Sequence, residues 1–192
     1  VGNIGTPYTQ VALRTEDQSV TVAEVSSFQL ETIMNFRPDV SAILNITPDH
    51  LDRHHTMECY IAVKEQIAVN QTEKDICVLN YDDKILRNFG QQTDFKPKTV
   101  FFSSSQKLNE GYYLDKDMIV SSQDGKITPI LNVKELNLLG KHNYENVMAA
   151  VAVSEAMGVS LPVIQRVVKK FKAVEHRIEF VLERSGVRYY ND

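Results

Sequence analysis

The sequence predicts an α/β fold, in which a mostly parallel sheet is flanked by helices and extended by a small antiparallel meander. Three observations support this class. Short β-rich runs alternate with helical patterns, as in chains built from strand–helix–strand units. The apolar run at 42–44 is continuous, which is typical of a strand covered on both faces. The Asp124-Gly125 pair within 111–130 is a hairpin signal.

Four stretches have the composition of strands. In chain order they are 20–28, 40–46, 75–80 and 99–104. Residues 56–70 have apolar residues at helical spacing. The meander at 111–130 is followed by two more helices, at about 143–157 and 160–172.

Capping signals mark the ends of these two helices. The first ends at Gly158, and the second begins after Ser160 with Pro162 in its first turn. The pattern then returns to strand, so we expect residues 1–173 to form one domain and 174–192 to begin another. The chain opens in a glycine-bearing loop without Met and closes on a strand with no partner after it. We therefore expect it to be part of a longer protein.

The amino-acid composition narrows the classes of function that this chain can have. Of the 192 residues, 43% are hydrophobic and 24% are charged, as in ordinary globular proteins, and the net charge of −4 argues against a nucleic-acid-binding surface. Cys59 and Cys77 form no CxxC pair, so a reduced, cytoplasmic setting is expected. No apolar stretch approaches the roughly 20 residues that span a bilayer, so we expect no membrane partner.

Glu24 lies late in the predicted strand 20–28, and Ser26 and Ser27 follow it. Open α/β sheets bind ligands outside the carboxyl ends of their strands. A carboxylate with hydroxyls at that edge can hold Mg²⁺ and phosphate oxygens. A solvated strand end with an N-cap serine explains the same residues, so this stretch alone leaves both interpretations open.

The loop after strand 40–46 is dense in histidine and aspartate. His50 would emerge at the same sheet edge as Glu24, and the residues crowded nearby are Asp49, Asp52, His54 and His55. Such a loop suits metal or phosphate binding, although a polar turn is an equal alternative.

Lys64 falls at the centre of the apolar stripe of helix 56–70. A charged ammonium facing a core is costly unless it is paired or modified. The long stem can carry the charge to the surface, or burial can depress the pKa of the amine. A neutral amine can react with CO₂ to give a carbamate, which is a carboxylate-like metal ligand.

Asn143 and Asn146 lie three residues apart near the start of helix 143–157. Asn143 is either the N-cap of that helix or, with Asn146, one of two amides that contact a base or ribose. Arg177, at the expected domain boundary, can reach a phosphate or form a surface ion pair. The sequence contains no GxxxxGK[ST] phosphate loop.

The chain resembles the Mur ligase family over essentially its whole length. The motifs that carry the resemblance are, in order, GNIGTP, AEVSSFQLE, LNITPDHLDRH, GKHNYEN, HRIE and YYND. SSFQLE is the most selective of them. The resemblance implies a P-loop-type central ATPase domain at 1–173, without its upstream phosphate loop, and the first strand of a C-terminal α/β domain at 174–192.

The activity implied by the resemblance is ATP-dependent addition of D-glutamate to UDP-N-acetylmuramoyl-L-alanine through an acyl phosphate, in peptidoglycan precursor synthesis. ATP and two Mg²⁺ sites are implied as cofactors, and a monomer is expected. This part of the chain is expected to be inactive alone.

The resemblance also implies residue roles. The catalytic, metal-holding side chains would be Glu24, His50 and Lys64 as its carbamate. Contacts with the UDP-sugar would come from Asn3 and Ser26. The nucleotide-binding residues would be Asn143, Asn146, Arg177 and Asp192.

Two alternatives remain open from the sequence. One is another amide ligase of the same fold, either a Mur ligase for a different amino acid or a folylpolyglutamate-synthase-like enzyme. The other is a non-catalytic nucleotide-binding module. A GKT-type loop upstream of Val1 would favour an enzyme.

Overall fold

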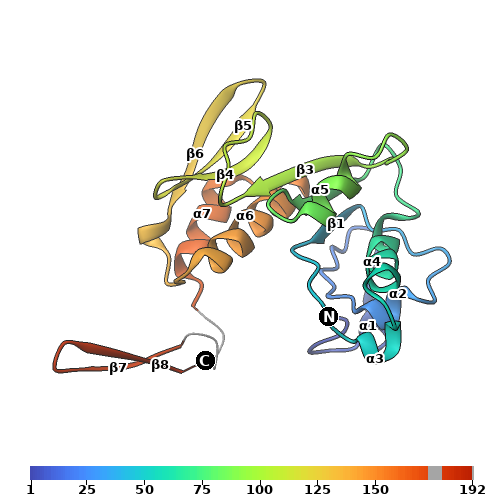
Figure 1. Ribbon diagram of the computed structural model, residues 1–192, viewed down its shortest axis with the longest axis horizontal. Coiled ribbons are helices and arrows are strands. Elements are labelled where there is room, and N and C mark those ends of the chain that lie inside the picture. Colours follow the sequence, from blue (N-terminus) through green and yellow to red (C-terminus); the bar gives the residue numbers. More distant parts are fainter. Residues whose placement is uncertain (173–178, 192) are drawn as a thin grey trace. The chain divides into compact units, whose positions relative to one another are not determined.

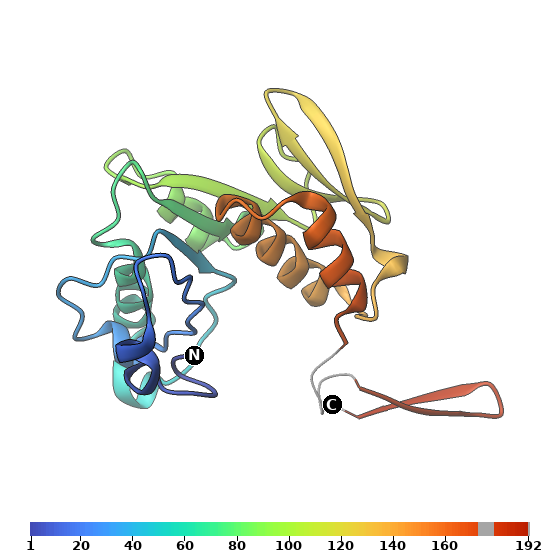
Figure 2. The same cartoon turned by 180° about the vertical axis from the view of Figure 1, so that it is seen from behind.

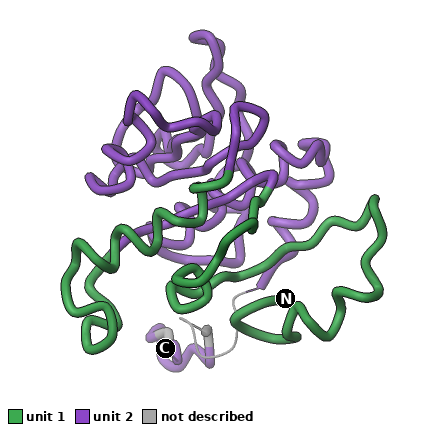
Figure 3. Tube along the Cα trace, turned by 90° about the vertical axis from the view of Figure 1, so that its right-hand side faces the viewer, with its two compact units in different colours: residues 1–38, 47–70 green, residues 39–46, 71–192 purple. Residues whose placement is uncertain are grey.

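The computed structural model describes residues 1–172 and 179–191. The chain forms two compact units, one of residues 1–38 and 47–70 and one of residues 39–46 and 71–192 (Figure 3). In the described ranges, no helix combines the length and apolarity needed to cross a membrane. Arg177, Asp192 and the expected domain boundary lie outside the described residues.

The second unit contains a six-stranded sheet in the order β1-β2-β3-β4-β5-β6 (Figure 1). The strands are β1 (Val40–Ile43), β2 (Ile76–Asn80), β3 (Lys98–Ser103), β4 (Gly111–Asp115), β5 (Met118–Gln123) and β6 (Lys126–Asn132). The first four are parallel, and the last three form the antiparallel meander. The predicted class, the three parallel strands and the meander are confirmed, although β1 already ends at Ile43.

Helices cover both faces of the parallel part of this sheet. Val78 of β2 belongs to the core built with α6 (Lys141–Ala156), which contacts β1 to β4. Leu79, the next residue, lies against Gly90 at the end of α5 (Lys84–Gly90). Because successive side chains of a strand point to opposite faces, β2 is apolar without interruption from Ile76 to Leu79.

The local signals in the second half of the chain are confirmed. Asp124 and Gly125 have φ of 51° and 74°, the left-handed values that a tight hairpin turn needs. Gly158, with φ of 78°, follows α6. Ser160 precedes α7 (Leu161–Lys170), which has Pro162 in its first turn. Helices α6 and α7 run side by side (Figures 1 and 2).

The strand pattern near the C-terminal end is also confirmed. Strands β7 (Glu179–Arg184) and β8 (Val187–Asn191) form their own two-stranded antiparallel sheet. A turn at Ser185 and Gly186, both with positive φ, connects them.

The first unit is built from short helices and loops. Its helices are α1 (Tyr8–Val11), η1 (Ala12–Arg14), α2 (Ser27–Leu30), α3 (Leu51–His54), α4 (Met57–Glu65) and η2 (Gln66–Ala68). Helix α4 packs against α2 and α3. Thr56 caps α4 by accepting a hydrogen bond from the Cys59 N–H at 3.2 Å. The predicted helix 56–70 is therefore present as α4 continued by a 3₁₀ turn.

The predicted strand at 20–28 is wrong. Only Glu24 of this stretch pairs, in an isolated bridge with Gly2, and Val20 and Val22 are 66% and 77% exposed. Ser26 and Gln29 form a capping box that begins α2 at Ser27, so the end of the stretch is helical. For the residues before it, the described part of the chain supplies no neighbouring strand, only the bridge to Gly2.

Candidate functional site

The structure brings Asn3 and Glu24 together. The Asn3 backbone N–H donates to the Glu24 carbonyl at 2.8 Å, and its side-chain amide donates to the Glu24 carboxylate at 3.2 Å. Gly2 permits this approach, because its φ is 110° and a Cβ there would lie 2.2 Å from the Glu24 carbonyl oxygen. The exposed Glu24 carboxylate is thus held by Asn3, and it does not lie at the end of a sheet strand.

Ser26 is committed to the start of α2. Its hydroxyl accepts from the Gln29 N–H at 3.3 Å, and the Gln29 side chain accepts from the Ser26 N–H at 2.9 Å. The N-cap interpretation of this serine is therefore confirmed. The capping box fixes the direction in which α2 leaves the Glu24 segment.

His50 precedes α3 in the left-handed region, with φ of 52°. Its ring lies 4.9 Å from the ring of Phe28 in α2, and its Nε2 is 3.4 Å from the Asp49 carboxylate. The side chain remains 49% exposed. The two predicted polar loops therefore meet through the Phe28 ring within the first unit.

The crowd of acidic and histidine side chains near His50 does not form a metal cluster. Among the described residues, no group of three His, Cys, Asp or Glu side chains gathers closely enough to hold a metal ion. His54 is buried, with Nε2 3.0 Å from the Ser27 hydroxyl and Nδ1 3.5 Å from Glu31. It joins α3 to α2 instead of facing a ligand.

Arg53 reinforces this connection between α3 and α2. Its guanidinium donates twice to the Glu31 carboxylate, from Nε at 3.1 Å and from Nη2 at 2.5 Å. The Arg53 hydrogen bond lowers the pKa of Glu31. The guanidinium also lies 4.9 Å from the centre of the Phe28 ring. The residues that follow His50 are therefore held against α2.

Lys64 is half-buried on α4, not buried as the sequence suggested. Its ammonium lies 5.7 Å from the centre of the ring of Tyr60, which is buried. None of the described residues forms an ion pair with Lys64. The Glu24 carboxylate and the His50 imidazole are groups of the kind that bind divalent cations, and both belong, with Lys64, to the first unit.

The second unit has a polar cluster that the sequence interpretation missed. It lies where β2 and β3 end, and its centre is Asp82. The Asp82 carboxylate accepts from the hydroxyls of Ser103 at 2.7 Å and Ser104 at 3.1 Å, and from the N–H groups of Ser104 and Ser105 at 2.9 and 3.1 Å. Burial raises the pKa of Asp82, but these hydrogen bonds together outweigh it and lower the pKa.

Two features of the sequence could have revealed this cluster. The segments LNYDD and FSSSQ each contain the end of an apolar strand and the polar residues after it, the arrangement predicted for the Glu24 segment. Their partner Glu145 lies 41 residues beyond Ser104, so no local pattern announces the contact. The argument that placed Glu24 at the carboxyl ends of parallel strands therefore holds for the residues that end or follow β2 and β3.

Because the pKa of Asp82 is lowered in the folded protein, the free energy of unfolding depends on pH. Its contribution is fully present above the unfolded-state pKa of an aspartate and is lost as pH falls through the lower folded-state pKa. We expect Asp82→Asn to cost about 1 to 3 kcal/mol at neutral pH, from weakened charged hydrogen bonds. Urea unfolding of the full-length protein between pH 3 and 7 measures this, and the variant should approach wild type at the acid end. A constant difference across that range would contradict the assignment.

Asn143 and Asn146 lie in the first turns of α6. Gly140, with φ of 97°, occupies the N-cap position, so the N-cap interpretation of Asn143 is wrong. The Asn143 side-chain amide instead donates back to the Leu139 carbonyl at 2.7 Å. Asn143 is half-buried and Asn146 is exposed.

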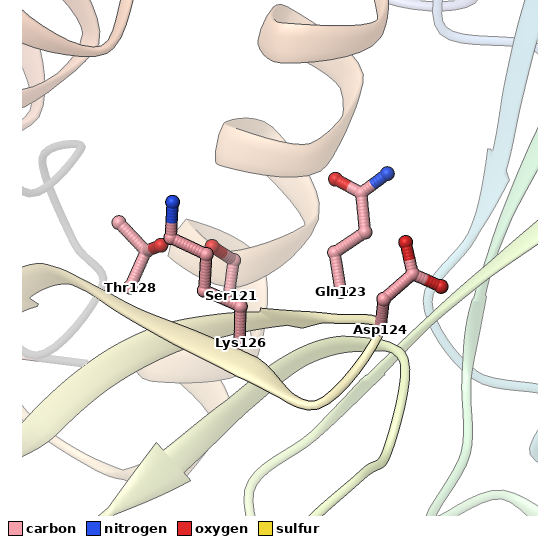
Figure 4. A pocket seen from close by; sticks show the side chains of 5 residues that line it. All are labelled: Ser121, Gln123, Asp124, Lys126 and Thr128. Carbon is pink, nitrogen blue, oxygen red and sulfur yellow. The ribbon is translucent and has the colours of Figure 1, made fainter.

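A separate hollow of about 340 Å³ lies on the hairpin of β5 and β6. Its polar side chains stand on one side of the ribbon (Figure 4). They are Ser121, Gln123, Asp124, Lys126 and Thr128. The hollow is a shallow surface of exposed and half-buried groups, and we assign it no chemistry.

Comparison with known families identifies the fold that carries these residues. The family model described as the Mur ligase middle domain matches residues 2–154. The chain belongs to the Mur ligase family. Its match to the middle domain contains the Glu24, His50, Lys64 and Asn143 segments.

This Mur ligase chain is similar to named ligases, both in sequence and in structure. It is 56% identical, over all 192 residues, to the UDP-N-acetylmuramoylalanine–D-glutamate ligase of Lachnospira eligens, and covers 42% of that protein. A solved UDP-N-acetylmuramoyl-L-alanyl-D-glutamate–2,6-diaminopimelate ligase is 25% identical with a TM-score of 0.63, over 84% of this chain and 35% of the other. MurF of Thermotoga maritima in complex with ADP is 20% identical with a TM-score of 0.55, over 81% and 35%.

Proposed function

We propose that this chain is the central, nucleotide-binding part of an ATP-dependent ligase that adds D-glutamate to UDP-N-acetylmuramoyl-L-alanine in peptidoglycan precursor synthesis. The observation that carries the proposal is the 56% identity, over the whole chain, to a D-glutamate ligase. The chain spans 42% of that relative's length, so the rest of the enzyme would supply the phosphate loop and the D-glutamate site. Residues 1–173 would belong to the central domain and 174–192 to the C-terminal one.

In the proposed reaction, the L-alanyl carboxylate attacks the γ-phosphorus of ATP, the bond to the bridging oxygen breaks, and ADP leaves. The amine of D-glutamate then attacks the acyl phosphate carbon, loses a proton, and expels inorganic phosphate. Protein groups serve here mainly to position reactants and to neutralise charge.

We infer that Glu24, His50 and Lys64, as its carbamate, would hold two Mg²⁺ ions. The ions would neutralise charge on the phosphate oxygens. Two contacts hold members of this set in place, because Asn3 donates to the Glu24 carboxylate and Phe28 packs on His50. Asn3 and Ser26 would lie next to the UDP-sugar.

The amide of Asn143 supports adenine as the base. One N–H of its NH₂ group is used by the Leu139 carbonyl, which leaves its oxygen and its second N–H for a ligand. These two groups can pair with the exocyclic amine and N7 of adenine, whereas guanine presents a carbonyl where adenine has the amine. Asn146, Arg177 and Asp192 would complete the contacts with base, phosphates and ribose.

The test is phosphate release by the full-length protein with ATP, Mg²⁺ and UDP-N-acetylmuramoyl-L-alanine. We expect release with D-glutamate and none with L-glutamate, L-lysine or no amino acid. Release with another amino acid would move the protein to a sister ligase. A folded protein that releases no phosphate with any acceptor would overturn the proposal and favour a non-catalytic nucleotide-binding module. Sedimentation of the same preparation tests the proposed monomer.

A further inference from the structure

The first turns of α6 are fastened along one face. The Lys141 ammonium donates to the Ser105 hydroxyl at 2.6 Å. One turn later the Glu145 carboxylate contacts the Ser104 hydroxyl and accepts from the Asn80 amide at 3.4 Å. These two side chains belong to the same face because they are four residues apart. The start of the helix is thus fastened to residues that follow or end two strands.

The partners of this face are themselves immobilised. Asn80 is only 4% exposed, its NH₂ group also donates to the Leu44 carbonyl at 3.1 Å, and its oxygen accepts from the Asp82 N–H at 2.9 Å. Asp82 in turn holds Ser104 and Ser105 through their N–H groups. Because Leu44 follows β1, the contacts that hold α6 involve residues at the ends of three parallel strands, β1, β2 and β3.

The anchored face lies almost opposite the asparagine face. At about 100° per residue, Lys141 and Glu145 are about 40° apart, and Asn143 and Asn146 are about 60° apart. The centres of the two pairs are separated by about 150° around the helix axis. Any rotation of the helix start that frees Glu145 therefore moves both asparagine amides.

We propose that Glu145 is a positioning residue for the nucleotide base. Its contacts with Ser104 and Asn80 fix the rotation of the first turns of α6, and so fix where Asn143 presents the groups of its side-chain amide that remain for a ligand. Glu145 does not touch the nucleotide in this proposal, which rests on the proposed assignment of Asn143 and Asn146 to adenine. Loss of the anchor weakens ATP binding and reduces the preference for ATP over GTP.

The experiment is calorimetric binding of ATP and of GTP, each with Mg²⁺, to the full-length protein. Glu145→Ala is expected to raise the Kd for ATP about tenfold and to leave the weaker GTP binding nearly unchanged. Glu145→Gln keeps an acceptor for Asn80 and a group that can bond Ser104, so it should stay close to wild type. Ser104→Ala removes part of the same anchor from the loop side and should act in the same direction as Glu145→Ala.

The matched control is Glu155→Ala on the same helix. Glu155 accepts from the Tyr112 hydroxyl at 2.7 Å, far along α6 from the asparagines, so its loss should lower the unfolding temperature without changing the Kd for ATP. Equal ATP affinities for Glu145→Ala and Glu155→Ala would overturn the positioning role. So would a Glu145→Gln protein as impaired as Glu145→Ala, because charge and not the anchor would then matter.

The outcomes separate this proposal from the ligase itself. If the wild-type protein binds no ATP, the positioning role and the nucleotide site fall together. If it binds ATP with the expected variant pattern but releases no phosphate with any amino acid, the ligase assignment is overturned and the positioning role stands.

Discussion

Replacing Lys64 by alanine in the full-length protein is expected to reduce turnover by roughly a thousandfold, a typical cost of removing one group that stabilises developing charge. The reason is the proposed role of Lys64, whose amine would combine with CO₂, with release of a proton, to give a carbamate, so that an oxygen ligand replaces a cation. Lys64 is the candidate because it is half-buried on α4 and has no ion-pair partner among the described residues. Phosphate release with ATP and D-glutamate measures the effect.

Two further variants separate the carbamate from a simple cation. Lys64→Arg keeps the positive charge and the contact with Tyr60 but cannot become a carbamate, so it should be as inactive as Lys64→Ala. A small carboxylate such as acetate should partly restore Lys64→Ala, which has room for it, and not Lys64→Arg. Lys74→Ala, at an exposed position, is the control. Full activity in Lys64→Ala or in Lys64→Arg would refute the carbamate role.

Gly111→Ala is expected to destabilise the second unit by about 3 kcal/mol or more. Gly111 begins β4 with φ of 113°, and a Cβ there would lie 2.2 Å from the carbonyl oxygen of Phe101 in the neighbouring strand. The clash is with backbone, so it can be relieved only by separating β4 from β3. Urea unfolding of the full-length protein, followed by far-UV circular dichroism, measures the loss.

Gly125→Ala provides the matched control for this substitution. Gly125 also has positive φ, 74°, but nothing lies within 4 Å of the Cβ that alanine would add. Its cost should be only the strain of a left-handed alanine, about 1 kcal/mol. Equal losses for the two variants would show that the dihedral angle, and not the contact with Phe101, makes glycine necessary at 111.

The parallel strands and the meander could be predicted because their signals are local. Continuous apolar runs imply cover on both faces, and Asp124-Gly125 can adopt the positive φ values of a tight turn. The prediction of a strand at 20–28 was wrong because composition does not say whether a neighbouring strand is present. A capping box at Ser26 then decided the local structure.

The candidate site could be predicted in part for a related reason. Residue types identified Glu24, His50 and Lys64 as candidates, and the structure gives each a defined neighbour. It could not be foreseen that His54 would be buried against Ser27, because a histidine in an acidic loop has the same appearance whether it faces solvent or a helix. The Asp82 cluster was missed since its members are brought together only by the sheet.

The order of the strands also has consequences for how the sheet is assembled. The three strands of the meander follow one another along the chain, so their contacts close short loops and can form early. Strand β1 is different, because residues 47–70 of the first unit are inserted between it and its only described neighbour, β2. Pairing β1 with β2 must therefore close a long loop, which costs entropy before any contact repays it. Folding of the second unit would then proceed from the meander inward, and its last step would be the pairing of β1 with β2.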